Sequence, residues 1–237
     1  MIFTALTIAA ALAHAQPPDI SGSYRLDLVI ASKANVPVFG EAEIMAQTTM
    51  LAQISPDGQG GYTQRHITCS VSPRTSLKVA QTTIPPSFIA PMSEKVYPVV
   101  LTERPDGRWT YRADFGPQHI GFRPELSGGM PPAEATHPGV VDWEGDGHPG
   151  ATILLQVPVF GQVEVYITQL AHTRIDGVLV ESGGASGKVE VVALEQRSIG
   201  AKPMLFAANP AVTQMPGQSR FILTPTTATT CQQLPAL

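Results

Sequence analysis

The sequence predicts an all-β protein: an antiparallel meander of about ten strands that forms a barrel or near-barrel. Three observations support this fold class. Apolar and polar residues alternate with period two over long stretches. Clusters rich in Gly, Pro, Asp and Ser separate these stretches. The pentapeptide Val-Pro-Val-Phe-Gly occurs twice, at 36–40 and 157–161. A two-sheet β-sandwich is the alternative, but a barrel better hides the edges of long strands.

The chain begins with a short apolar run, Ile2 to Ala13, which ends in the small-x-small sequence Ala13-His14-Ala15. This order is typical of a secretory signal peptide, and the run is shorter than the roughly 20 residues that span a bilayer. We therefore expect removal of residues 1–15 and export of a single all-β domain, residues 16–237, to the periplasm or the extracellular space. A buried N-terminal helix is the alternative. No later segment predicts a transmembrane span.

The repeated pentapeptide opens a longer match. Residues 36–54 align with 157–175 without a gap, and both segments alternate as half-buried strands do. Thr48 in the first copy, and Gln169 and Thr173 in the second, are polar exceptions on the apolar faces. Pro and Gly in the pentapeptide indicate a bend or a strand entrance, with Phe39 and Phe160 expected in the core beside it.

The match predicts two related β-halves, at about residues 20–115 and 142–225, joined by the Pro/Gly-rich stretch within residues 116–141. Chance convergence of two similar strands is the alternative. The remaining elements follow from alternation and turn residues. In order, we expect a strand at 24–30, a turn at 56–61, a strand at 62–71, a helical turn within 84–90, a hairpin of 96–103 and 109–115, a strand at 151–157, a turn at 182–187, a strand at 188–199, and short strands at 204–208 and 220–223.

The chain has two cysteines, Cys69 and Cys231. In an oxidising compartment an even number of cysteines indicates disulfide pairing, so we expect these two to form one bridge. Two buried free thiols are the alternative.

One segment, Asp142 to Gly150, has the character of a metal site. Acidic residues at its first, third and fifth positions, followed by Gly147, resemble the start of a calcium loop. The candidate calcium ligands are the side chains of Asp142, Glu144 and Asp146 together with the carbonyl of His148. The bidentate Glu expected at the twelfth position is absent, because that residue is Ile153. The alternative is an Asx-type turn that leads into the next strand.

Composition argues against several other functions. Charged residues make up 14% of the chain, the net charge is −4, and no basic cluster occurs, so nucleic acid is not an expected partner. The Ser182–Lys188 stretch lacks the glycine spacing of a phosphate-binding loop. The histidines beyond the signal peptide show no metal-site spacing, and no nucleophile motif is present. These histidines are His66, His119, His137, His148 and His172.

The Asp142–Gly150 segment also resembles a group of uncharacterised exported bacterial proteins of similar length. They carry an Asp-x-Asp-Gly-Asp-Gly-x-Pro-Gly segment before a β-strand, and Glu144 is the departure here. The Gln64-Arg65-His66 sequence before Cys69, and Leu194–Arg197, add to the resemblance. It implies export and one shared all-β fold, and it implies no activity and no catalytic residues.

These observations favour an exported, non-enzymatic β-domain that binds a small molecule or an envelope protein, or that serves an envelope structure. The alternative is a hydrolase whose Asp, Glu and His residues come together from separate loops, such as Asp142–His148. A polar cleft with His and carboxylates in hydrogen-bond reach would favour the enzyme. A barrel cavity would favour the binder.

Overall fold

The computed structural model describes residues 16–36, 40–77, 81–92 and 94–235. The expected signal peptide, residues 1–15, lies outside the described residues. The fold is nearly all β, with 59% strand and 6% helix. Within the described part of the chain, no helix is long and apolar enough to cross a membrane.

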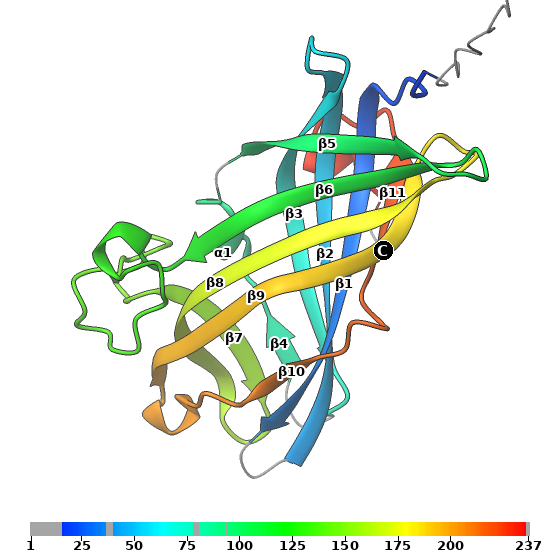
Figure 1. Ribbon diagram of the computed structural model, residues 1–237. Coiled ribbons are helices and arrows are strands. Elements are labelled where there is room, and N and C mark those ends of the chain that lie inside the picture. Colours follow the sequence, from blue (N-terminus) through cyan, green and yellow to red (C-terminus); the bar gives the residue numbers. More distant parts are fainter. Residues whose placement is uncertain (1–15, 37–39, 78–80, 93, 236–237) are drawn as a thin grey trace, which may run out of the picture.

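The strands and helices follow one another in a simple order (Figure 1). They are β1 (Gly22–Val36), β2 (Gly40–Pro56), β3 (Tyr62–Thr75), β4 (Gln81–Thr83), α1 (Pro86–Ile89), β5 (Lys95–Glu103), β6 (Trp109–Ile120), the 3-10 helix η1 (Pro124–Leu126), β7 (Ala151–Val157), β8 (Gly161–Leu179), β9 (Ala185–Lys202), the 3-10 helix η2 (Met204–Phe206), β10 (Val212–Gln214), β11 (Arg220–Pro225) and the 3-10 helix η3 (Cys231–Gln233).

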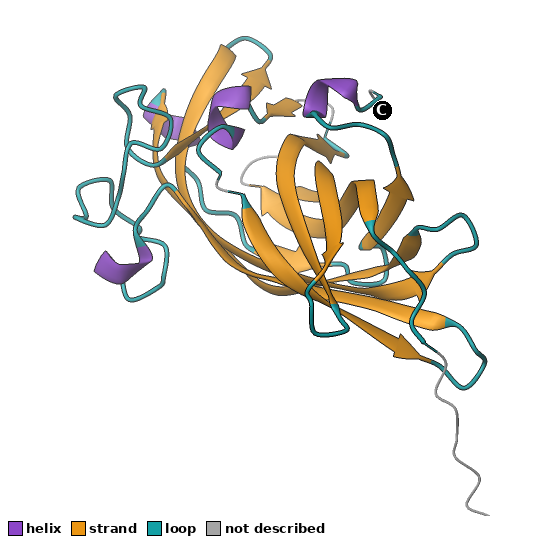
Figure 2. Cartoon of the chain, turned by 90° about the horizontal axis from the view of Figure 1, so that it is seen from above, coloured by secondary structure: helices purple, strands orange, loops and turns teal. Residues whose placement is uncertain are grey.

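Eight of these strands form a ring. Its order is β8, β6, β5, β3, β2, β1, β11 and β9, and β9 pairs again with β8. Figure 2 shows the strands curving around a common centre. The pairs around the ring are antiparallel, so the predicted antiparallel near-barrel is confirmed. Closure of the ring pairs the strand edges around the upper cluster, which is the reason that the sequence favours a barrel. Below this level the ring is less complete, because β5 pairs with β3 only at Tyr62–His66.

The two copies of the repeated segment occupy comparable places. Each copy contains the central strand of three consecutive strands: β2 pairs with β1 and β3, and β8 pairs with β7 and β9. The two differ because β8 also pairs with β6 along its second half. Both predicted halves supply strands to the same ring, and an origin by duplication stays a prediction.

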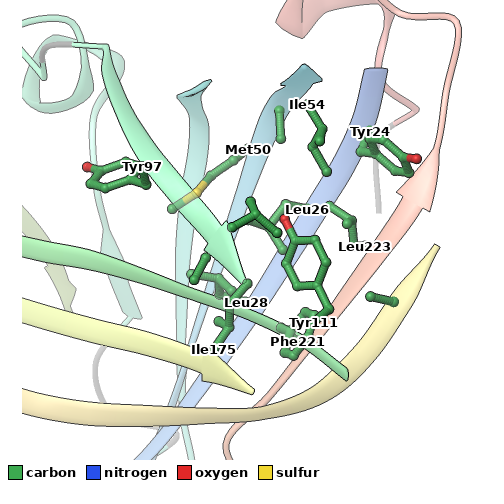
Figure 3. Close-up of a cluster of buried hydrophobic side chains, with 14 of the residues drawn as sticks. Tyr24, Leu26, Leu28, Met50, Ile54, Tyr97, Tyr111, Ile175, Phe221 and Leu223 are labelled. Carbon is green, nitrogen blue, oxygen red and sulfur yellow. The ribbon is translucent and has the colours of Figure 1, made fainter. Parts of the chain in front are cut away.

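The upper part of the barrel is filled by apolar side chains (Figure 3). Tyr111 and Leu26 have no exposed surface, and Ile54, Ile175 and Phe221 are each 1% exposed. These residues come from five of the eight strands of the ring, so burying them holds these strands together. A fully buried aliphatic or aromatic side chain stabilises a fold by about 1.5–3 kcal/mol, which makes this cluster the main source of stability.

A second apolar cluster lies where β7, β8 and β9 extend past the first one. Val163 and Ile167 of β8 and Ala151 of β7 are completely buried there, and the α1 residue Phe88 is 4% exposed. The Trp143 Nε1 donates a 2.8 Å hydrogen bond to the Phe88 carbonyl, which fixes α1 in this position. The expected helical turn within 84–90 is therefore present, and it packs its one buried side chain into this second cluster.

The turn between β7 and β8 departs from expectation. Val157 pairs with Gly161, so Pro158, Val159 and Phe160 form a three-residue turn. Phe160 is 53% exposed, so its expected place in the core is wrong, whereas Phe39 lies outside the described residues. Val159 has φ of 73°, a left-handed backbone that costs an L residue about 1–2 kcal/mol.

Several short elements also differ from the prediction. Residues 204–208 do not form a strand, because Pro203 lacks an N–H and its carbonyl instead accepts a 3-10-type bond from Phe206 at 3.2 Å. The strands β4 and β10 are not predicted by the sequence. Thr168 of β8 is buried, and its hydroxyl donates a 2.7 Å hydrogen bond to the Pro132 carbonyl in the connection between β6 and β7.

Candidate functional site

The Asp142–Gly150 loop forms a compact turn around one carboxylate. Asp142 Oδ1 accepts the backbone N–H groups of Gly145 at 2.8 Å and Asp146 at 3.0 Å, and its Oδ2 accepts that of Gly147 at 2.8 Å. These donors, with Gly147 the largest contributor, lower the pKa of Asp142. The loop is therefore a tight turn around the ionised carboxylate of Asp142, and calcium binding stays a prediction.

Glu144 behaves differently from its neighbour. Its Oε1 accepts the Thr152 backbone N–H at 2.8 Å, which joins the loop to β7. Its Oε2 is buried and has no hydrogen-bond partner. Burial raises the pKa of Glu144, with the nearby carboxylates of Asp146 and Asp142 adding to the effect. A carboxylate in this position gains from any positive charge beside it.

Asp146 completes the acidic group. Its Oδ1 accepts the His148 backbone N–H at 2.9 Å and its Oδ2 accepts the Thr152 hydroxyl at 3.1 Å. One carboxylate oxygen from each of Asp142, Glu144 and Asp146 lies within 4.8 Å of the others. Calcium binds oxygens at 2.3–2.6 Å, so two of its ligands lie at most about 5 Å apart, and the three side chains meet this limit.

The side chain of His148 does not join the acidic group. Its ring stacks on Tyr166 at 4.6 Å, and its Nε2 lies 3.9 Å from Glu164 Oε2. The Tyr166 hydroxyl donates a 2.8 Å hydrogen bond to the same Glu164 oxygen. Only the carbonyl of His148 was expected as a ligand, and its ring instead holds the loop against β8.

The two cysteines are close enough to form the expected disulfide. Their Sγ atoms lie 1.99 Å apart and their Cα atoms 5.3 Å apart. Cys69 is the extra residue of a bulge in β3, where Thr49 pairs with Ser70 and Met50 with Thr68. The bulge turns the Cys69 side chain out of the ladder, toward η3 at the end of the described chain.

A histidine–carboxylate cluster, not foreseen from the sequence, lies on the outer wall of the barrel. Asp114 Oδ1 lies 2.6 Å from His172 Nε2, and its Oδ2 accepts a 2.6 Å bond from Arg174 Nε. Arg174 contributes most to lowering the pKa of Asp114 far below its usual range. His172 and Arg174 lie on the outward face of β8, as the alternation of that strand predicts. Their contact with Asp114 of β6 also depends on the bulge between Asp114 and Pro117.

This outer cluster does not form a catalytic triad within the described residues. A triad needs a nucleophile in hydrogen-bond contact with the histidine. The hydrogen bond that the structure shows for the His172 side chain goes to Asp114, and Arg174 occupies the other carboxylate oxygen. The arrangement is a surface ion-pair cluster, and it gives no specific support to the hydrolase alternative.

The inward-facing residues between the two apolar clusters form a third feature, which we call the middle layer. On β8, Ile175 belongs to the upper cluster and Ile167 to the lower one, and both are buried. Between them, Gln169, Ala171 and Thr173 face the same way, because β8 keeps an unbroken alternation, yet all three are only half-buried.

The same break occurs on β2, β3, β6 and β9, whereas on β1 Leu28 and Ser32 are buried beside Thr48 and Ile44. On β2, Met50, Ala52 and Ile54 are buried, but Thr48 and the next inward residues are half-buried. The register places further half-buried or exposed residues beside these, on β3, β6 and β9. The middle layer therefore comprises Ile44, Ala46, Thr48, Val71, Gln118, Gln169, Ala171, Thr173, Val191, Leu194 and Gln196.

The middle layer is neutral and mixed in character. Its apolar members are aliphatic, its polar members are Thr and Gln, and none of the residues named is charged. The sequence contains a signal for it: Thr48, Gln169 and Thr173 are the polar exceptions on otherwise apolar faces. The meaning of these exceptions becomes visible only when the ring brings them to one level.

No family model, curated protein or solved structure matches this chain. The resemblance to exported bacterial proteins with a similar Asp-Gly segment therefore stays a prediction. Function is inferred below from the fold and from the chemistry of these sites.

Proposed function

We propose that this chain is an exported, non-catalytic β-barrel domain that binds a small neutral molecule in its middle layer. The observation that carries the proposal is the break in burial along the inward faces. Inward-facing residues of a filled barrel are buried, as those of the upper cluster are. Half-buried residues facing inward between two buried clusters indicate space that a small molecule can fill.

The lining favours a particular ligand chemistry. Thr and Gln side chains donate and accept hydrogen bonds without charge, and the aliphatic members of the middle layer offer apolar contact. A charged ligand would lose its hydration without gaining a partner of opposite charge. We therefore expect a compact neutral molecule that carries hydroxyl or amide groups.

Two observations support export. The cysteine pair lies at disulfide distance, and disulfides persist in oxidising compartments. The N-terminal sequence has the pattern of a signal peptide, although residues 1–15 lie outside the described residues.

The binding proposal is tested by filling the middle layer. Ala171 pairs with Gln118 and Leu194, so Ala171→Leu adds three carbons inside the barrel. A neutral polarity-sensitive dye, N-phenyl-1-naphthylamine, should bind the unmodified mature chain saturably, with one site per chain. Ala171→Leu should weaken this binding by about tenfold or more, because overpacking displaces the dye.

The matched control makes the same change on the outside of the wall. Ala193 pairs with His172 and faces outward, so Ala193→Leu should leave dye binding unchanged. Equal loss of dye binding in both variants, or no saturable binding at all, would contradict binding in the middle layer and leave the envelope-structural alternative. Native mass spectrometry of the exported protein would then identify any molecule that remains bound during purification.

A further inference from the structure

Apolar side chains gather on the turn between β7 and β8 and on the start of η2. Six exposed residues form this surface, which we call the apolar tip: Pro158, Val159, Phe160, Pro203, Met204 and Leu205. Val159 is completely exposed, and Met204 and Leu205 are 69% and 66% exposed. The rings of Phe160 and Phe206 meet edge to face at 5.2 Å, which holds the two segments together.

The conformation of Val159 does not fit a purely structural turn. Its positive φ of 73° is one that glycine or asparagine adopts with less strain than a β-branched residue does. Its side chain also makes no buried contact that could offset this strain, because it is fully exposed. Strained residues of this kind concentrate at functional sites, so an apolar side chain at this position needs a role outside folding.

We propose that the apolar tip inserts into the interfacial region of a lipid bilayer and docks the barrel on a membrane surface. Figure 1 shows the β7–β8 turn and η2 at the same end of the molecule, below the body of the barrel. An apolar turn can enter the boundary between headgroups and acyl chains, to a depth of about 5–10 Å. A stable protein–protein interface buries about 800 Å² on each partner. Such an interface needs a broader surface than one short turn and one helical turn offer, so a bilayer is a better occupant than a protein.

Charge favours a zwitterionic membrane over an anionic one. The six residues of the apolar tip carry no charge, and the whole chain has a net charge of −4. Docking therefore depends on apolar contact and needs neither acidic lipid nor low salt. The proposal is independent of ligand binding in the middle layer, because the two features involve different residues.

The test uses the mature chain and sedimentation with phosphatidylcholine vesicles. The unmodified protein should sediment with the vesicles to the same extent at low and at high salt. Val159→Asp and Leu205→Asp should each weaken this binding by about tenfold or more, because a carboxylate resists entry into the interface. Val100→Asp is the matched control, since Val100 is 54% exposed on the outer wall at β5, and it should bind as the unmodified chain does.

A second variant separates docking from folding. Val159→Gly removes the strain and the apolar side chain together, so it should melt no lower than the unmodified chain and still bind vesicles more weakly. Three results would overturn the proposal: no vesicle binding, binding that Val100→Asp weakens as much as Leu205→Asp does, or binding restricted to anionic vesicles and lost at high salt. Self-association of the chain that the tip variants abolish would instead assign this surface to a second copy.

Discussion

At the scale of single residues, a buried glutamine determines the state of a buried histidine. The Tyr111 hydroxyl donates to Gln64 Oε1, which directs Gln64 Nε2 toward His66 Nδ1 at 2.8 Å. An amide N–H can only donate, so His66 Nδ1 must accept, and the neutral ring carries its proton on Nε2. Burial lowers the pKa of His66 to about 4, and its ring packs against Tyr97 and Phe115.

This histidine should make the protein less stable in mild acid. The pKa of His66 is about 4 when folded and 6.5 when unfolded, so the unfolded state binds a proton first as the pH falls. The contribution of neutral His66 to the free energy of unfolding is fully present above pH 6.5, and it falls by about 3 kcal/mol by pH 4. His66→Gln keeps an acceptor for Gln64 and cannot be protonated in this range.

Urea denaturation of both proteins at several pH values between 7 and 4 measures this effect. As the pH falls, the unmodified chain should lose more stability than His66→Gln does. A difference that stays constant over this range would show that His66 does not titrate as its burial requires.

At the scale of elements, the Asp142–Gly150 loop links two parts of the fold. It is the last part of the connection between β6 and β7, and Trp143 within it holds α1. Its three carboxylates are stabilised by backbone and hydroxyl donors, but Glu144 Oε2 has none. The turn therefore folds with its own donors, and calcium binding is an additional property that the sequence predicts.

Calcium should raise the melting temperature of the protein if this prediction is correct. An open set of three side chains and one carbonyl resembles weak extracellular sites, with dissociation constants of about 10⁻⁴ to 10⁻³ M. At ten times that constant, calcium would add about 1.4 kcal/mol, or about 3–5 °C for a chain of this size. Calorimetry in millimolar calcium against chelator measures the gain.

The variant Asp146→Asn should lose this gain, because it removes one charge while keeping an oxygen for the His148 N–H. Asp57→Asn is the control, since Asp57 accepts backbone N–H groups in a similar turn, from Gln59 and Gly61. An unchanged melting temperature with calcium would mean that the loop is only a turn.

Sequence patterns predict the long elements of this fold better than the short ones. Period-two alternation places β7 at residues 151–157, where the structure has it. The three-residue strands β4 and β10 are too short to show alternation, and they exist because they pair with β7 and β1. Tertiary pairing, not local sequence, determines such strands.

The candidate sites show the same limit. The acidic residues of the Asp142–Gly150 loop lie at alternate positions of one short segment, so the sequence alone identifies them as a candidate metal site. The middle layer depends on which residues share a level of the ring, and bulges in β6 and β9 determine that register. Gln169 is an anomaly in its own strand, but only the register places Gln196 beside it.

At the scale of the whole molecule, the ring and the disulfide stabilise the fold in different ways. The ring joins the first strand, β1, to β11 near the end of the chain. The disulfide begins on β3 and reaches η3, beyond the last strand of the ring, and joins residues 162 positions apart. Packing in the ring stabilises the native state, whereas a cross-link of this length acts mainly by restricting the unfolded chain.

Removal of the disulfide should therefore lower stability without opening the barrel. The double variant Cys69→Ser/Cys231→Ser should lose up to about 5 kcal/mol, the value that chain entropy gives for so long a loop. Its unfolded state would also be more expanded, so the denaturant m-value should rise as the midpoint falls. The far-ultraviolet circular dichroism spectrum should not change, because every strand of the ring ends before Cys231. Equal midpoints for the oxidised unmodified chain and the double variant, or two titratable thiols in the oxidised unmodified chain, would contradict this account, since either result means that the bridge does not constrain the unfolded chain.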